Sequence, residues 1–192
     1  MSIAPFPSEP GTRDALARDS ELLSLVLHDV LVEQCGEAFA RTVRWLHESA
    51  AELRNGDAVA GAALSELVRD LPQDEVEPCI RACALQLQLA NIAEERERVR
   101  RRRHYDATGV RQRESLMEAA DLLRAAGADL AAAVRALHVE LVLTAHPTEA
   151  TRRSVLEHQL HVARVLDRLD DPRTGRARRR ALVADLREAL TV

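Results

Sequence analysis

One short aliphatic run limits what this chain can fold into. Residues 139–144 read VELVLT, a segment rich in branched aliphatic side chains and too brief for an independent helix, so a buried β-strand is predicted there. A lone strand cannot pair its backbone N–H and C=O groups, because a ladder needs a neighbouring strand. Either this run is not a strand, or its partner strands lie outside the chain, and the second alternative explains more.

Outside this run the apolar residues recur at the spacing of amphipathic α-helices. A long helix is predicted from Ser20 to Arg54, where the turn signal Asn55-Gly56-Asp57 ends it. Asp74 is predicted to cap the third helix and Asp129 the fifth. The remaining helices are predicted at about 58–70, 74–103, 112–126, 130–137, 148–169 and 176–190.

The domain organisation follows from this pattern. Residues 1–19 hold three of the seven prolines and read as a flexible lead-in, whereas residues 20–192 form one helical portion. Aromatic residues make up only 2% of the chain, so a core has to be built from Leu, Val and Ala, and the chain is expected to need more partner surface than it carries. The predicted fold class is mostly α, with amphipathic helices and one short strand at about 139–144.

The charge pattern argues against a nucleic-acid-binding protein. The net charge is −4, and all 27 basic residues are arginines. The run ERERVRRRRHY at 95–105 is interpreted as a solvated helix end, because glutamates are interspersed with its arginines, and RARRR at 176–180 as an exposed helix face. The N-terminus lacks the pattern of a signal peptide, and no apolar run reaches the roughly 18 residues of a membrane span.

Cysteine and histidine spacings predict no metal site in this chain. Cys35, Cys79 and Cys83 are an odd number at no ligand spacing, which indicates reduced thiols and a cytoplasmic protein. His158 and His161 lie three residues apart without an evident third ligand. Trp45, the only tryptophan, is predicted to be a packing anchor rather than a ligand platform.

The stretch with candidate chemistry is Thr144-Ala-His-Pro-Thr-Glu149, directly after the predicted strand. In α/β barrels the loops after the carboxyl ends of the strands carry the active-site groups, and Pro147 would fix the backbone beside His146. The N-terminus of the following helix favours an anion, and Arg152 and Arg153 add positive charge. A neutral His146 could exchange a proton with an oxyanion substrate, although a histidine after a strand is more often structural than catalytic.

The residue string around His146 is a more specific indication of function than its position after a predicted strand. LVLTAHPTEATRRS at 141–154 closely resembles the histidine signature of the phosphoenolpyruvate carboxylase family, with a nearly continuous match from Val139 to Ser154. Weaker support comes from LQLQLANIAEERE at 85–97, which is similar to a helix upstream of that signature. The order and spacing of the helices also look like the start of such an enzyme.

The resemblance implies a helix-rich, TIM-like α/β barrel enzyme that forms oxaloacetate and phosphate from phosphoenolpyruvate and bicarbonate. Carboxyphosphate and the enolate of pyruvate are the intermediates it implies, Mg²⁺ is the cofactor, and biotin is not used. His146 takes the place of the family's catalytic histidine, and Arg152 and Arg153 match arginines that would orient or attract an anion. A cytoplasmic homotetramer is implied for the full-length enzyme, without nucleic-acid or membrane partners.

The chain also departs from the family pattern. The family's metal-binding carboxylates, a second catalytic segment with a lysine, and a Gly-Arg-Gly-Gly loop have no counterpart here, nor has its aspartate inhibitor site. The chain is therefore expected to be an N-terminal fragment that binds no metal and is inactive by itself. The alternative is a stand-alone helical interaction module that keeps the string without the chemistry.

Overall fold

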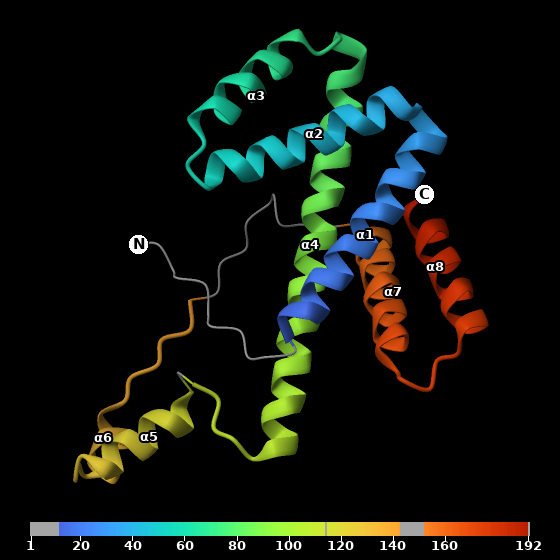
Figure 1. Ribbon diagram of the computed structural model, residues 1–192. Helices are drawn as coiled ribbons and strands as arrows, with labels where there is room; N and C mark the ends of the chain where they lie inside the picture. Colours follow the sequence, from blue (N-terminus) through green and yellow to red (C-terminus); the bar gives the residue numbers. More distant parts are fainter. Residues whose placement is uncertain (1–11, 114, 143–151, 192) are drawn as a thin grey trace.

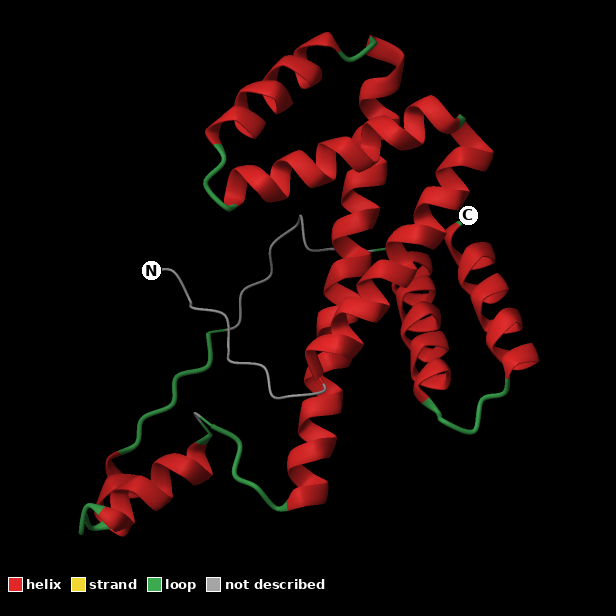
Figure 2. Ribbon diagram, viewed as in Figure 1, coloured by secondary structure: helices red, strands yellow, loops and turns green. Residues whose placement is uncertain are grey.

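The computed structural model describes residues 12–113, 115–142 and 152–191, which form helices and, within those ranges, no strand (Figures 1 and 2). The helices of this part of the chain are α1 (Thr12–Cys35), α2 (Glu37–Arg54), α3 (Ala58–Asp70), α4 (Gln73–Thr108), α5 (Leu116–Ala125), α6 (Leu130–Ala136), α7 (Arg153–Asp170) and α8 (Arg176–Leu190). None of the described helices is both long and apolar enough to cross a membrane.

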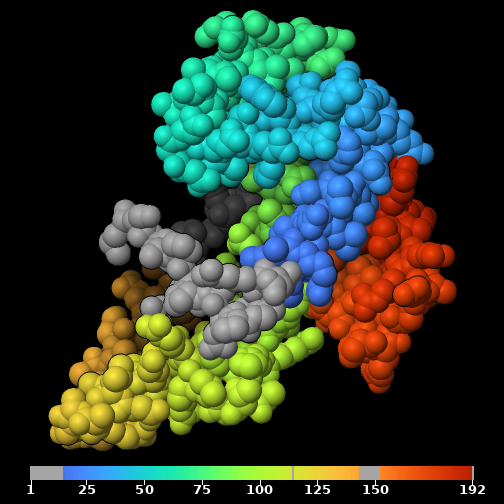
Figure 3. Space-filling model, in the orientation of Figure 1, coloured from blue at the N-terminus to red at the C-terminus, as the bar shows by residue number. Residues whose placement is uncertain are grey.

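Helix α4 is the axis on which the other helices are arranged (Figure 1). Helices α1 and α7 both pack against it, and α8 packs against α7 and α1. Helices α2 and α3 lie at the end where α4 begins, while α5 and α6 lie beyond the end where it finishes. Helices α5 and α6 pack on each other, and neither packs as extensively on another described helix. This pair therefore projects from the body in the space-filling view (Figure 3).

The main core lies between α1, α4, α7 and α8. Each of these helices contributes aliphatic side chains at helical spacing, and none of the core residues is aromatic. Its buried members are Leu23, Val26, Leu27, Val30, Leu89, Ile92, Ala93, Val162, Val165, Leu166, Leu182, Leu186 and Leu190. The prediction of a core built from Leu, Val and Ala is confirmed for this cluster, to which Ile92 adds.

A second, smaller core joins α2 to the start of α4. Phe39, Val43 and Leu46 of α2 pack there with Cys79 and Ala82 of α4, and leucines of α3 cover the cluster. Burial raises the pKa of the Cys79 thiol, and the neighbouring Cys83 and Glu75 raise it further. Cys79 therefore stays protonated near neutral pH and serves as a small apolar side chain rather than a reactive thiolate.

The prediction of one helix from Ser20 to Arg54 is wrong at both its start and its middle. Helix α1 begins at Thr12, within the expected lead-in, of which residues 1–11 lie outside the described residues. The segment then breaks at Gly36, whose φ of 91° lies in the left-handed region that glycine adopts without a Cβ penalty. The apolar pattern continues on both sides of Gly36, which is why periodicity alone predicts a single helix.

Several helix boundaries agree closely with the sequence. Helices α3 and α8 match their predicted ranges, and the Asp57 side chain caps α3 by accepting bonds from the backbone N–H groups of Val59 and Ala60. Asp129 caps α6 as predicted. The predicted cap at Asp74 is wrong, since the N-cap residue of α4 is Pro72, two residues earlier, and Asp74 lies in the first turn of the helix. Helix α4 also continues beyond Arg103 to Thr108, where Gly109 in a left-handed conformation ends it.

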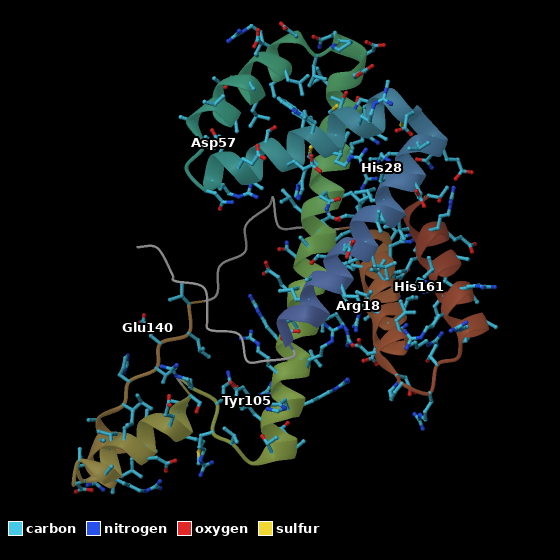
Figure 4. The ribbon with its side chains drawn as sticks, viewed as in Figure 1. Arg18, His28, Asp57, Tyr105, Glu140 and His161 are labelled. Atoms are coloured by element: carbon cyan, nitrogen blue, oxygen red, sulfur yellow. The ribbon has the colours of Figure 1, made fainter. Side chains whose placement is uncertain are left out.

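The predicted strand at 139–144 is not observed. Residues 139–142 have no regular secondary structure, and residues 143 and 144 lie outside the described residues. Leu141 is 82% exposed, and Val139 and Val142 are also exposed. Figure 4 shows the labelled Glu140 on an extended connection between α6 and the residues that the structure does not describe. No described segment offers a neighbouring edge, so the strand lacks the partner on which its backbone pairing depends.

Candidate functional site

The structure places only one edge of the predicted site. His146, with Thr144 to Thr151 around it, lies outside the described residues, so its predicted catalytic role is untested. Arg152 and Arg153 lie inside them, at the start of α7. The candidate site can therefore be built only from α7 and from the helices that hold it.

The first turn of α7 has properties that suit an anion. Arg152 is the N-cap residue and its side chain makes no capping hydrogen bond, and the first turn contains no acidic residue. The leading N–H groups of a helix have no intrahelical acceptor and carry the positive end of the helix dipole. The helix begins at Arg153 rather than at about residue 148, so these donors belong to residues 153–155 rather than to 148–151.

Arg153 is oriented along α7 rather than toward the preceding loop. Its Nε lies 2.8 Å from Oε1 of Glu157, one helical turn away, and both side chains are exposed. An exposed pair of this kind contributes roughly 0.3–0.5 kcal/mol and can be exchanged for another anion at little cost. This contact uses only Nε of the guanidinium, so it leaves the Nη donors of Arg153 for an anion.

A charged cluster fixes the far end of α7 to α4 and α1. Arg96 and Arg100 of α4 pair with Asp167 and Asp170 of α7, with Arg96 Nη2 lying 2.6 Å from Asp167 Oδ1 and Arg100 Nε lying 2.7 Å from Asp170 Oδ2. Arg100 also donates to Asp19 of α1, which is buried. We call these five residues the arginine–aspartate cluster. Arg18, labelled in Figure 4, adds an exposed guanidinium from α1 at 2.7 Å from Asp170.

The pKa values in this cluster follow from its geometry. The hydrogen bond from Arg96 holds the pKa of Asp167 below its usual value against a smaller, opposing effect of burial, and Arg103 helps to lower it. Burial lowers the pKa of Arg100, but the hydrogen bonds to Asp170 and Asp19 outweigh that effect and raise it. These shifts favour the charged forms of Asp167 and Arg100, and each buried charge of the cluster has a partner of opposite charge, as burial of a charge requires.

This cluster corrects the interpretation of residues 95–105 as a solvated helix end. Arg96 and Glu97 are buried and Arg100 is largely so, although Arg98, Arg102 and Arg103 are exposed. The signal was present in the sequence, because Arg96 and Arg100 continue the apolar stripe of Leu89 and Ile92 at helical spacing. A charged side chain at a buried position of a helix indicates that a residue of opposite charge pairs with it. By contrast, the arginines of 176–180 are all exposed, as predicted.

Among the described residues, no group of three His, Cys, Asp or Glu side chains is arranged to hold a metal ion. His158 faces a groove beside α4, whereas His161 is exposed. Burial raises the pKa of the Cys83 thiol, which makes it a poor ligand near neutral pH. Trp45 is 38% exposed, borders a shallow surface hollow and belongs to neither core, so its predicted role as a packing anchor is not confirmed.

Comparisons with known proteins give this scaffold a family. The family model for phosphoenolpyruvate carboxylase matches residues 16–192. A phosphoenolpyruvate carboxylase of Ralstonia nicotianae is 40% identical over 172 residues, which are 86% of this chain and 17% of that protein. Carboxylases of Xanthomonas euvesicatoria and Burkholderia mallei are 36% and 35% identical, over 85% and 84% of this chain and 19% and 17% of their own lengths.

The chain thus spans less than a fifth of the length of these relatives. The family match begins within α1 and runs through every later helix, so it covers the whole scaffold that holds α7 as well as the string before it. On the strength of this match, the chain belongs to the phosphoenolpyruvate carboxylase family.

Proposed function

We propose that this chain supplies the N-terminal part of a phosphoenolpyruvate carboxylase. Such an enzyme forms oxaloacetate and phosphate from phosphoenolpyruvate and bicarbonate, through carboxyphosphate and the enolate of pyruvate. The observation that carries the proposal is the family match over residues 16–192, which includes the complete string from Val139 to Ser154. The substrates, the barrel and the reaction come from the family and belong to the proposal.

Within this proposal His146 is the catalytic group of the chain. It would act at the carboxyphosphate and carboxylation stage, by proton transfer or by stabilising developing negative charge. The N-terminus of α7 supports an anionic substrate nearby, because the N-cap residue Arg152 makes no side-chain cap and the first turn holds no carboxylate. Arg152 and Arg153 would attract or orient that anion, Arg153 through the Nη donors that its contact with Glu157 leaves unused.

The residues described here do not fit a Mg²⁺ site, since no three ligand side chains come together among them. The metal that the family implies would be held by residues outside this chain. Biotin is not expected. We further propose a cytoplasmic enzyme that forms a homotetramer at full length, with neither nucleic acid nor membrane as a partner.

The uncovered apolar surface favours this proposal over a stand-alone interaction module. Helices α5 and α6 have 10 and 7 residues, and neither has a buried residue. Isolated helices shorter than about 12–15 residues are marginal in water, so this pair needs a surface to pack on. Leu116, Leu122 and Val134 on the pair, like Leu141 and Val142 after it, are exposed. A self-sufficient module would have covered them.

The test uses the chain alone and a chimaera in which residues 16–192 replace the matching segment of the Ralstonia nicotianae carboxylase. With Mg²⁺ present, residues 1–192 alone should form oxaloacetate only at the background rate. The chimaera should turn over, and His146→Asn in the chimaera should reduce kcat by at least about 100-fold, the lower range for loss of a general acid or base. Turnover by the isolated chain, or full activity without the imidazole, contradicts the proposal.

The uncovered faces should also make the isolated chain self-associate. Sedimentation velocity should show a weight-average mass that increases with protein concentration. A chain that stays monomeric and unfolds cooperatively at every concentration would instead support the interaction module.

A further inference from the structure

A second uncovered surface lies on the main body, away from α5 and α6. It is a groove of about 320 Å³ between α4, α7 and α8. Its walls are mainly aliphatic and its few polar side chains lie among them. The lining includes Ala84, Leu85 and Ile92 of α4, Val155 of α7, and Leu190 of α8. We call this hollow the α4–α7–α8 groove.

The groove is an open side of the main core. Leu89, Ile92, Val162 and Leu190 belong to the buried cluster and also line the groove, so the groove reaches the edge of the core, where Ile92 and Leu190 keep 7% and 8% of their surface exposed. Protein interiors are packed as densely as organic crystals, and an apolar wall that faces a hollow loses dispersion contacts. Filling the groove with aliphatic side chains would restore them.

Beside the groove, α4 presents an apolar stripe to solvent. Ile80, Ala84 and Leu87 recur at i, i+4 and i+7, the spacing of one helix face, and all three are exposed. Ala84 belongs to both the stripe and the groove wall. A ligand that fills the groove can therefore extend over the stripe, which suits a polypeptide segment better than a compact small molecule.

Two glutamines give the apolar wall a polar anchor. Nε2 of Gln159 on α7 donates to Oε1 of Gln88 on α4 at 3.3 Å, and both side chains are half-buried at the groove. A glutamine amide offers two donors and an acceptor with two lone pairs, so this bond leaves several positions free on each. An incoming segment could bond there with its backbone or with a polar side chain.

We propose that the α4–α7–α8 groove docks an aliphatic helix from the part of a phosphoenolpyruvate carboxylase that this chain does not contain. The relatives are more than five times as long as the segment that this chain matches, so most of such an enzyme is available to cover the groove. A helix fits because it can set leucine-like side chains into the groove and lie along the stripe of α4. The inference rests on the proposed function for its occupant.

Thiol labelling at Ala84 tests the docking independently of catalysis. Ala84→Cys is introduced into residues 1–192 and into the chimaera with the Ralstonia nicotianae carboxylase, and the rate of maleimide labelling at that position is followed by peptide mass spectrometry. Residue 84 is exposed in the chain alone. Its labelling should slow by at least about tenfold in the chimaera, because the groove is then covered.

Ala177→Cys is the matched control. Ala177 is an exposed alanine on α8, near the end of that helix remote from the groove-lining Ala189 and Leu190. Its labelling rate should differ by less than about twofold between the two proteins, since only a covered site is protected. Labelling compares exposure and does not depend on turnover, so an inactive chimaera with a protected residue 84 refutes the proposed function and leaves the docking intact.

Three outcomes would overturn the docking. Equal labelling of residue 84 in the chain and the chimaera shows an open groove. Protection of residue 84 in the isolated chain that grows with concentration shows that a second copy is the occupant. A chimaera that is insoluble, where the unaltered carboxylase and the isolated chain are soluble, shows that the groove does not accept that polypeptide.

Discussion

The arginine–aspartate cluster allows a quantitative test of how α1, α4 and α7 are held together. The perturbation is Arg100→Met, which keeps an unbranched side chain of similar reach and removes the charge. Arg100 is 14% exposed at its side chain, and its partner Asp19 only 4%. Among the side chains that the structure describes, the substitution leaves the buried Asp19 carboxylate paired with Arg18, whose Nη2 lies 3.3 Å away.

The expected cost follows from these burials. Removing one partner of a buried ion pair costs about 3–5 kcal/mol, because the other charge stays desolvated. The contact with Arg18, which is largely exposed, offsets up to about 1 kcal/mol of this. The free energy of unfolding should therefore fall by roughly 2–4 kcal/mol. With a urea dependence of about 2 kcal/mol per molar, the unfolding midpoint should move down by roughly 1–2 M.

The assay is urea unfolding followed by far-ultraviolet circular dichroism, at a protein concentration low enough to keep the chain monomeric. Arg81→Met is the matched control. Arg81 also lies on α4 and pairs with Glu77 at 2.6 Å, but the two side chains are 79% and 74% exposed. Its removal should change the free energy of unfolding by less than about 0.5 kcal/mol, as is usual for exposed pairs.

A double-mutant cycle separates charge pairing from packing. Asp19→Asn combined with Arg100→Met removes both charges, and the coupling energy between the two positions should be on the order of 1.5–3 kcal/mol. If Arg100→Met costs no more than Arg81→Met, or if the two substitutions are additive, the cluster does not hold the helices by buried charge pairing and the reasoning is refuted.

Two further predictions concern pH and the break between α1 and α2. The pKa of Asp167 is lower in the folded chain than the unfolded value of about 3.9, because Arg96 donates a hydrogen bond to it. Its contribution to stability is therefore complete above the unfolded value and is lost as the pH falls below about 4 and through the folded pKa. Asp167→Asn should make the urea midpoint less dependent on pH in this range. An unchanged pH dependence would contradict the stabilising role of the ionised Asp167 side chain. Gly36→Ala should cost about 1–2 kcal/mol, since φ is 91° while nothing lies within 4 Å of the added Cβ. Gly175→Ala, also in open space but at a φ of −71°, should stay within about 0.5 kcal/mol of the unaltered chain, and equal effects at the two glycines would exclude backbone strain as the cause.

Helix boundaries were predictable where a local signal sets them. Asp57 and Asp129 are capping residues immediately before an apolar helical pattern, and the structure has helices that start directly after them. The break at Gly36 was missed because the apolar residues on either side keep the same spacing, and no proline or turn pair marks the site. A positive φ at one glycine is set by how α1 and α2 each pack on α4, which is tertiary information.

The arginine–aspartate cluster shows a different limit of sequence reasoning. An arginine-rich run is usually solvated, and for Arg98 and Arg102 that expectation holds. Arg96 and Arg100 differ only in their position on the buried face of α4, where aspartates of two other helices meet them. Their burial depends on partners about 70–80 positions away along the chain, which no local window contains.

The failed strand and the uncovered surfaces have one physical cause. Residues 139–142 have the composition of a strand, yet a strand exists only when a second backbone accepts and donates its hydrogen bonds. Without that neighbour the run has no regular secondary structure, and Leu141 is exposed to water, which is unfavourable for an aliphatic side chain. The same reasoning applies to α5, α6 and the α4–α7–α8 groove, whose apolar side chains also lack a covering layer. Composition therefore indicates a preference for strand or for burial in these segments, while the described helices do not supply the backbone partner or the apolar layer that such a structure needs.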